Sequence, residues 1–319
     1  SEMCIRDRTG ELNRVEIIAR GVEMLHSGHG EIKSQRYSYT GDLDTEVWYD
    51  QKGRWVGMEF KGKDGSIITY VCQQCLSSKD WNQIYGVTKI VNTVWVTGAG
   101  KGIGRELAKI FAENSWTVAV SARTENDLIS LQNEFANKQI NKYPLDVSDL
   151  DATVRTIAEM EKEIGFPNLV VLNAGTHMPI SVESFSVEKV RTLMEVNFMG
   201  VVNALSEIIP KFVSAGEGHI AIVASLAGYR GLPSASGYGA SKAALINMCE
   251  SLRPELMKYN VRLTLINPGF VETPLTDQND FEMPFIITAK DAAERIFREI
   301  EDCKFEIVFP KRFAFIMKA

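Results

Sequence analysis

The chain has 319 residues, 45% of them apolar and 24% charged, which is typical of a soluble protein with one large α/β domain and a smaller module. Its 35 basic and 41 acidic side chains give a net charge of −6, which argues against nucleic acid or an anionic membrane as the main partner. No apolar run approaches the roughly 20 residues that span a bilayer, and the five Cys are scattered, so we expect a reduced, cytoplasmic protein without a membrane span.

The first 90 residues are predicted to be a small β-rich segment followed by a linker. Turn residues such as Asp64-Gly65 separate short strand-like runs, which lie at 32–39, 45–50, 55–61 and 66–72. We expect an antiparallel sheet of three or four strands. Residues 1–8 follow no structural pattern and look like foreign sequence, so a non-native fusion is one explanation of the whole segment.

Two alternatives stay open for this segment. Cys72-x-x-Cys75 and His26-x-x-His29 have the ligand types that zinc prefers, but the gap between the pairs is long, and we predict no metal. The segment is also a candidate interaction domain, with the rest of the chain as its effector.

Between residues 91 and 319 strand-like and helix-like stretches alternate, which indicates a parallel sheet covered by helices on both faces. The strand-like runs are 93–96, 117–121, 169–172, 220–223, 261–266 and 306–309. The helix-like stretches are 103–113, 125–137, 149–164, 187–212, 239–258 and 289–300. This pattern predicts an α/β, doubly wound sheet of the Rossmann type.

A glycine-rich loop, Thr97-Gly98-Ala99-Gly100-Lys101-Gly102-Ile103-Gly104, follows the first of these strands and opens a helix. Glycine lets the backbone approach a pyrophosphate closely, and the helix N-terminus offers unpaired N–H groups to it. In this strand–turn–helix context the loop predicts a dinucleotide site.

The end of the second strand bears on the choice of dinucleotide. NAD enzymes place an acidic residue there to bind the ribose hydroxyls, whereas this chain has Ser121-Ala122-Arg123. The guanidinium of Arg123 suits a 2′-phosphate, and Lys101 offers a second positive charge. We therefore expect NADP(H) rather than NAD(H); the alternative is that both are solvated surface cations.

Tyr238 and Lys242 are four residues apart at the start of a predicted helix, so that they share one helix face. A neighbouring ammonium stabilises a phenolate, and we expect it to lower the pKa of Tyr238 toward the range of an acid–base catalyst. Ser225 follows a strand at the sheet edge where ligands bind, and its hydroxyl is a candidate donor to a substrate oxygen.

Together these motifs resemble the short-chain dehydrogenase/reductase family over residues 91–319. The matching residues are Thr97-Gly98-x-x-x-Gly102-x-Gly104, Asn173-Ala174-Gly175, Asn197, Ser225, Tyr238-x-x-x-Lys242 and Pro268-Gly269. The resemblance implies the strand order 3-2-1-4-5-6-7 and a homodimer or homotetramer formed through two long helices. Residues 9–75 faintly resemble the end of a small β-rich bacterial domain of unknown function.

The resemblance also implies roles for single residues. Tyr238 would be the general acid/base, with Lys242 tuning it and holding the nicotinamide ribose. Ser225 would orient the substrate carbonyl, and Asn197 would hold a water in a proton relay. The remaining implied cofactor contacts are Asp146, Val147, Asn173, Ala174, Gly175, Pro268, Gly269 and Thr273.

Substrate choice is expected to lie in the loop between Pro268 and Ala289, which contains the apolar residues Phe270, Phe281 and Met283. These predict an apolar or medium-sized carbonyl or alcohol substrate, although core packing explains them equally well. The predicted function is hydride transfer between NADP(H) and that substrate. The alternative is a catalytically silent module that binds a dinucleotide as a sensor.

Overall fold

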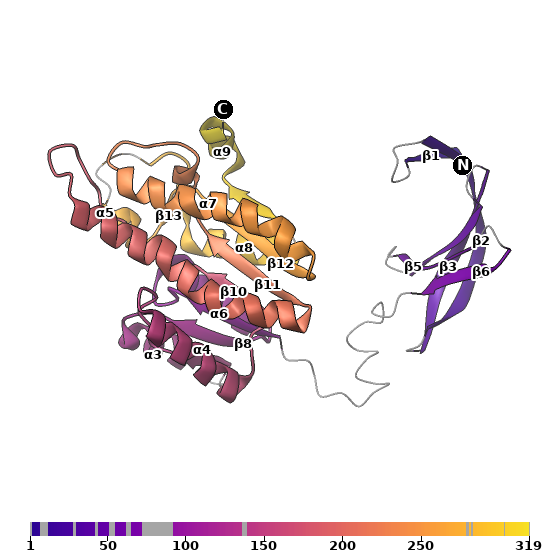
Figure 1. The fold of residues 1–319 in the computed structure, drawn as a ribbon, viewed down its shortest axis with the longest axis horizontal. Coiled ribbons are helices and arrows are strands. Elements are labelled where there is room, and N and C mark those ends of the chain that lie inside the picture. Colours follow the sequence, from indigo (N-terminus) through magenta and orange to yellow (C-terminus); the bar gives the residue numbers. More distant parts are fainter. Residues whose placement is uncertain are drawn as a thin grey trace. The chain divides into compact units, whose positions relative to one another are not determined.

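A computed structural model describes residues 2–6, 12–27, 30–41, 44–50, 55–61, 65–71, 92–135, 139–278, 281, 283–302 and 304–318. The chain divides into two compact units, Ser1–Ile90 and Val91–Ala319 (Figure 1). Each unit has its own sheet and its own buried apolar cluster.

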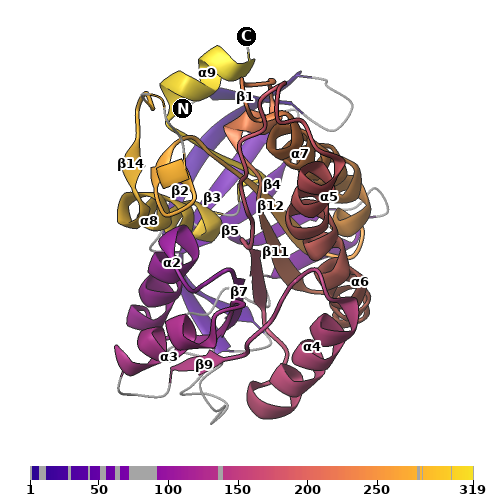
Figure 2. The same ribbon diagram turned by 90° about the vertical axis from the view of Figure 1, so that its left-hand side faces the viewer.

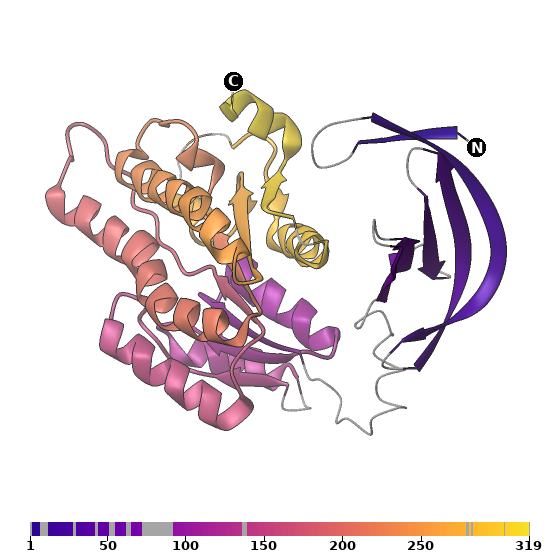
Figure 3. The same ribbon diagram turned by 45° about the vertical axis from the view of Figure 1, so that its right-hand side comes forward.

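The first unit is an antiparallel sheet in which each strand pairs with the next along the chain. Its strands are β1 (Glu2–Arg6), β2 (Leu12–Ser27), β3 (Gly30–Gly41), β4 (Thr45–Asp50), β5 (Trp55–Lys61) and β6 (Ile67–Val71). Figure 3 shows this sheet in indigo, with long strands that bend strongly. The sequence predicts strands at the positions of β3 to β6, and the structure adds β1 and β2.

A β-bulge explains why β2 escapes prediction. Its register with β3 shifts between Ala19 and Gly21, and Gly21 has a φ of +111°, a conformation that glycine adopts without strain. One extra residue moves the following side chains to the opposite face, so the period-two pattern breaks within the strand. β1 lies within residues 1–8, which by sequence alone look foreign.

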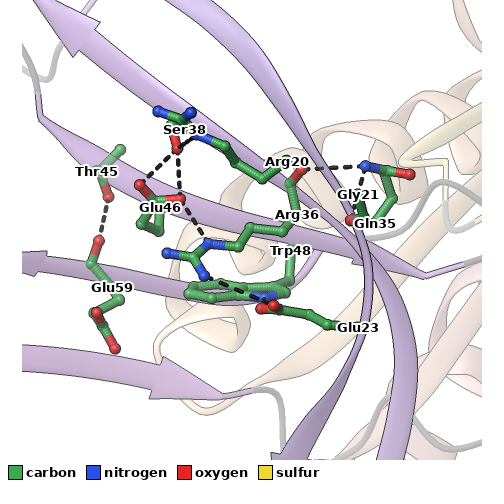
Figure 4. Close-up of polar contacts among 10 residues, drawn as sticks. All are labelled: Arg20, Gly21, Glu23, Gln35, Arg36, Ser38, Thr45, Glu46, Trp48 and Glu59. Atoms are coloured by element: carbon green, nitrogen blue, oxygen red, sulfur yellow. Dashed lines mark hydrogen bonds and ion pairs between the residues drawn. The ribbon is translucent and has the colours of Figure 1, made fainter.

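A row of polar side chains joins β2, β3 and β4 (Figure 4). Ser38 Oγ accepts a hydrogen bond from Arg20 Nε at 2.6 Å and donates to Glu46 Oε1 at 2.7 Å. Arg36 Nε donates to Glu46 Oε2 at 2.8 Å, and its guanidinium lies 5.4 Å from the ring centre of Trp48. Burial acts to raise the pKa of Glu46, but its hydrogen-bond donors prevail and lower it. Charge thus reinforces the backbone pairing of these strands.

The second unit is built on a parallel sheet with the order β15-β12-β11-β10-β7-β8-β9, which confirms the predicted order 3-2-1-4-5-6-7. Its strands are β7 (Thr93–Thr97), β8 (Thr117–Ser121), β9 (Ile140–Lys142), β10 (Leu169–Leu172), β11 (Gly218–Val223), β12 (Val261–Pro268) and β15 (Glu306–Phe309). No apolar run indicates β9, because this short edge strand buries only Ile140.

Helices cover both faces of the sheet, as predicted (Figure 2). One face carries α2 (Gly102–Glu113), α3 (Glu125–Asn133) and α8 (Ala289–Glu301). The other carries α4 (Leu150–Ile164), α5 (Val187–Met194), α6 (Gly200–Ala215) and α7 (Ser236–Met257). Side chains that are adjacent along a strand point to opposite faces of the sheet. Val94 and Val96 pack in the apolar cluster on the α2 face, and Trp95 packs in the cluster on the opposite face. Beside this sheet lie the short strands β13 (Val271–Glu272) and β14 (Ile287–Thr288) and the helix α9 (Lys311–Lys318).

A π-helical turn at Glu195–Met199 joins α5 to α6, so that the helical run extends from Val187 to Ala215. Among the described residues, this 29-residue run alone is long and apolar enough to cross a membrane by length and composition. Core helices of soluble proteins meet the same criterion, and this run buries Val201, Leu205 and Phe212 in the core. The finding is therefore weak evidence for a membrane span.

His219 couples the stability of the second unit to pH. Its Nε2 lies 2.9 Å from Thr264 Oγ1, whose hydroxyl donates to Lys304 O, so a neutral ring with the proton on Nε2 fits. Burial, and then the charge of Arg262, lower the pKa of His219 from 6.5 to about 4. Because the folded pKa is depressed, the contribution is complete above pH 6.5 and is lost as the pH falls toward 4. We expect about 3 kcal/mol of unfolding free energy to be lost from this group over that range.

Urea unfolding of the second unit at pH 7 and pH 4.5 measures this loss. His219→Gln keeps a side-chain donor but does not titrate, so its stability is expected to fall less over the same interval. An equal fall in both proteins would show that His219 carries no pH dependence.

Candidate active site

The predicted site residues gather around a cleft of about 430 Å³ at the carboxyl ends of β7, β8, β10 and β11. The predicted residues that line it are Gly98, Gly100, Lys101, Gly102, Ile103, Arg123, Asp146, Val147, Asn173, Ala174, Gly175, Ser225, Tyr238, Lys242, Pro268, Gly269 and Thr273. Gly104 and Asn197, predicted as cofactor and catalytic residues, do not line the cleft, and neither do the predicted substrate residues Phe270, Phe281 and Met283.

The glycine loop is shaped by close packing. Gly98 and Gly102 have φ values of +67° and +57°, where a side chain would be strained. A Cβ on Gly104 would lie 2.5 Å from both Asn173 Nδ2 and Gly98 O, so Gly104 lets α2 approach the loop rather than contacting a ligand itself. Asn173 Nδ2 donates to Thr97 O at 3.0 Å and to Gly98 O at 3.3 Å, which fixes the loop against the end of β10.

Asn197 lies in the π turn and is completely buried. Its Oδ1 accepts from the Thr176 N–H at 2.7 Å, and its Nδ2 donates to Thr176 O and to Ser241 Oγ, both at 3.0 Å. A Cβ on Gly175 would be 3.3 Å from Asn197 Oδ1 and 3.5 Å from Lys242 Nζ. The missing side chain of Gly175 thus leaves a space that both groups border.

The two groups at the centre of the cleft are Tyr238 and Lys242, on the first turns of α7. Lys242 Nζ donates to Val223 O at 2.8 Å and lies 5.8 Å from the ring centre of Tyr238. Burial lowers the pKa of Lys242 to about 8. Burial raises the pKa of Tyr238, and a hydrogen bond with Ser225 works in the opposite direction.

The expected fall in the pKa of Tyr238 is therefore wrong for the protein without a bound dinucleotide. The physical reason is that burial outweighs the lysine, whose ammonium is directed to the carbonyl of Val223. Ser225 is buried, with Oγ accepting from the Ala227 N–H at 3.1 Å and lying 3.5 Å from Pro268 O.

Beside the end of β8, the exposed cations Lys101 and Arg123 border the cleft together with Asp127. Lys101 Nζ lies 3.6 Å from Asp127 Oδ2, so part of the positive charge is paired. Sequence reasoning missed Asp127, although its place in the first turn of α3, just after Arg123, was a usable signal.

Asp146 Oδ1 accepts from both the N–H and the hydroxyl of Ser148, at 3.0 and 2.7 Å.

A second, smaller pocket adjoins Ser225 and Tyr238, and none of the described residues that line it is Asp, Glu, Lys or Arg. Two of the predicted substrate residues, Phe270 and Phe281, line it, whereas Met283 does not. The ring of His177 meets that of Tyr238 edge to face at 4.9 Å. The lining residues that sequence reasoning missed include Leu226, Ala227, Leu232, Thr276 and Phe313.

Among the described residues, no group of three or more His, Cys, Asp and Glu side chains is placed to hold a metal. Of the weak zinc pattern, Cys72, Cys75 and His29 lie outside the described residues.

Two family models match the chain. The model described as short chain dehydrogenase matches residues 92–283, and a domain of unknown function, DUF6134, matches residues 1–73. The second match confirms the resemblance seen in the β-rich segment, and it includes residues 1–8, which by sequence alone look foreign. An uncharacterized oxidoreductase of Myxococcus xanthus is 38% identical over 224 residues, covering 70% of this chain and 88% of the relative.

Solved structures share the fold of the second unit. A short-chain dehydrogenase/reductase of Burkholderia phymatum in complex with NAD superposes with a TM-score of 0.66 at 23% identity, covering 72% of this chain and 92% of its own. The closed form of a serine dehydrogenase complexed with NADP+ gives a TM-score of 0.63 at 25% identity, covering 68% and 94%. With its nucleotide-binding Rossmann sheet and the matched family model, this chain belongs to the short-chain dehydrogenase/reductase family of oxidoreductases.

Proposed function

We propose that the protein transfers a hydride between NADP(H) and an uncharged, medium-sized carbonyl or alcohol compound. One observation carries the proposal: Ser225, Tyr238 and Lys242 line the same cleft as the glycine loop, and Ser225 and Tyr238 also line the apolar pocket beside it. The dinucleotide cleft and the apolar pocket thus adjoin each other. The hydroxyl groups of Ser225 and Tyr238, which can donate to a substrate oxygen, line both.

The residues present fit a dinucleotide. The bare backbone of Gly98, Gly100 and Gly102 lines the cleft where α2 begins, and the helix N-terminus favours an anionic group there. Asp146, Asn173 and the loop from Pro268 to Thr273 would hold the rest of the molecule. When bound, the dinucleotide supplies or accepts the hydride.

In the reducing direction, Tyr238 donates its hydroxyl proton to the substrate oxygen as the carbon gains the hydride, which turns C=O into CH–OH. Its raised pKa keeps the hydroxyl protonated at neutral pH, the form that this step needs. Ser225 donates a hydrogen bond to the same oxygen, and Lys242 stabilises the phenolate left behind. A water beside Gly175, between Asn197 and Lys242, would return the proton, and oxidation reverses each step.

Three features support the preference for NADP(H): the position after Ser121 holds no acid, Arg123 stands at the loop start, and Lys101 borders the same part of the cleft. Asp127 opposes them, because it pairs with Lys101. The unpaired charge that favours a 2′-phosphate therefore rests mainly on Arg123.

We also propose a homodimer or homotetramer built on the long helices α5–α6 and α7, as the family resemblance implies. An apolar, partly exposed run from Val187 to Ala215 is consistent with a helix that a second copy covers.

The competing function, a silent dinucleotide sensor, is disfavoured because Ser225, Tyr238 and Lys242 are all retained.

The cofactor assignment predicts the outcome of replacing Arg123. In fluorescence titrations, the wild-type protein is expected to bind NADPH more tightly than NADH. Arg123→Ala is expected to weaken NADPH binding about 10- to 100-fold, the range for a lost charge-assisted hydrogen bond, and to leave NADH binding nearly unchanged. Arg155→Ala, at an exposed position on α4, serves as the matched control. A wild-type preference for NADH would overturn the NADP(H) assignment.

The catalytic assignment predicts that Tyr238→Phe lowers kcat for carbonyl reduction about 10³-fold, because the variant has no proton to give. The dissociation constant for NADPH should stay within about twofold, since the ring remains in place. Tyr259→Phe, at an exposed tyrosine that follows α7, controls for the loss of a hydroxyl as such. Full activity of Tyr238→Phe would remove Tyr238 from the mechanism, and a wild-type protein that binds NADPH without turnover would favour the sensor.

A further inference from the structure

Helix α9 closes one side of the pocket beside Tyr238. Its Phe313 is 9% exposed and packs with Leu226, the residue after Ser225. The ring of Phe313 lies nearly parallel to that of Phe270 at 5.5 Å between centroids, and the ring of Phe285 is 6.3 Å away. The aromatic wall of the pocket is therefore shared between the loop after β12 and α9.

The start of α9 packs tightly against the wall of the dinucleotide cleft. A Cβ on Gly269 would lie 3.0 Å from Pro310 Cδ, 3.2 Å from Phe313 Cδ1 and 3.3 Å from Leu226 Cδ1. Gly269 also lines the dinucleotide cleft. The start of α9 thus packs directly against Gly269, which lines both the dinucleotide cleft and the apolar pocket.

The far end of α9 is held by a separate set of polar contacts. Lys318 Nζ donates to Glu306 Oε2 at 2.6 Å and lies 4.9 Å from the ring centre of Tyr229. The other carboxylate oxygen of Glu306 accepts hydrogen bonds from the Tyr229 hydroxyl and, at 3.1 Å, from Asn267 Nδ2. Burial acts to raise the pKa of Glu306, but Lys318 and Tyr229 prevail and lower it, so the carboxylate is charged at neutral pH.

These contacts lead back to the catalytic serine. Tyr229 follows the 3-10 turn Leu226–Gly228, and its N–H donates to Leu226 O at 3.0 Å. The turn begins directly after Ser225, whose Oγ accepts from the Ala227 N–H. One carboxylate, Glu306, therefore connects the end of α9 to the residue after the turn that begins at Leu226, the residue that follows Ser225 and packs with Phe313.

We propose that Lys318, Glu306 and Tyr229 form an anchor that holds α9 in place as a wall of the substrate pocket, and that Lys318 is a positioning residue for the carbonyl substrate. This inference rests on the proposed function, because it assumes that the pocket receives the substrate. Without the anchor, Phe313 moves away from Leu226 and Phe270, so the substrate loses apolar contact while the dinucleotide keeps its own contacts.

The steady-state test uses the full chain with NADPH and 4-nitrobenzaldehyde, an uncharged aromatic aldehyde, as the probe. Lys318→Ala is expected to raise KM for the aldehyde about fivefold, as a part-exposed ion pair allows, with kcat and the NADPH dissociation constant nearly unchanged. Lys318→Arg keeps the charge and is expected to restore KM. Lys304→Ala is the matched control, because its ion pairs with Glu299 and Asp302 are also part-exposed and involve no residue of α9.

Hydrogen exchange of the NADPH-loaded protein tests the anchor without turnover. Lys318→Ala should speed exchange of the amides of residues 311–318 and 226–229, and Lys318→Arg and Lys304→Ala should not. Unchanged exchange and unchanged KM in Lys318→Ala would overturn the anchor. If the wild-type protein binds NADPH but does not reduce the aldehyde, the proposed substrate class fails, and the exchange at 226–229 still decides whether the anchor exists.

Discussion

The arrangement of the active site depends on one buried amide. Asn197 has no exposed surface, and its side chain bonds to the backbone of Thr176 and to the hydroxyl of Ser241. Leaving this buried amide without its hydrogen-bond partners would cost about 1–3 kcal/mol of folding stability. The folded protein therefore keeps these contacts. They join the loop after β10, the π turn and α7, and these elements carry Asn173 and Gly175 on one side and Tyr238 and Lys242 on the other.

Burial then sets the proton chemistry that these elements can perform. It brings the pKa of Lys242 down from 10.5 to about 8 and moves that of Tyr238 above its ordinary value of 10.0, so the two values move apart. The phenol of Tyr238 therefore keeps its proton at neutral pH, which is the form that can donate to a substrate oxygen. The ammonium of Lys242 donates to the Val223 carbonyl, and burial outweighs its effect on the phenol of Tyr238.

The features that could be predicted from the sequence depend on local patterns. The alternation of strands and helices, the glycine loop after β7 and the spacing of Tyr238 and Lys242 each lie within a short stretch of chain. Features that depend on contacts between distant residues were missed. Phe313 reaches the pocket only because α9 folds back over Leu226, and the pKa of Tyr238 is decided by burial, which no spacing reveals. β2 was missed because its bulge breaks the alternation that identifies a strand.

The π turn at Glu195–Met199 has a consequence for how this site tolerates change in the length of the chain. A π turn is an α-helix with one inserted residue, and each residue of a regular helix advances the side-chain direction by about 100°. Deleting one residue there would restore an uninterrupted helix, with its apolar face still able to pack on the sheet. The deletion would also turn Asn197 away from Thr176 and Ser241. The one inserted residue of the π turn thus positions Asn197 for the site, whereas an uninterrupted helix would only support the fold.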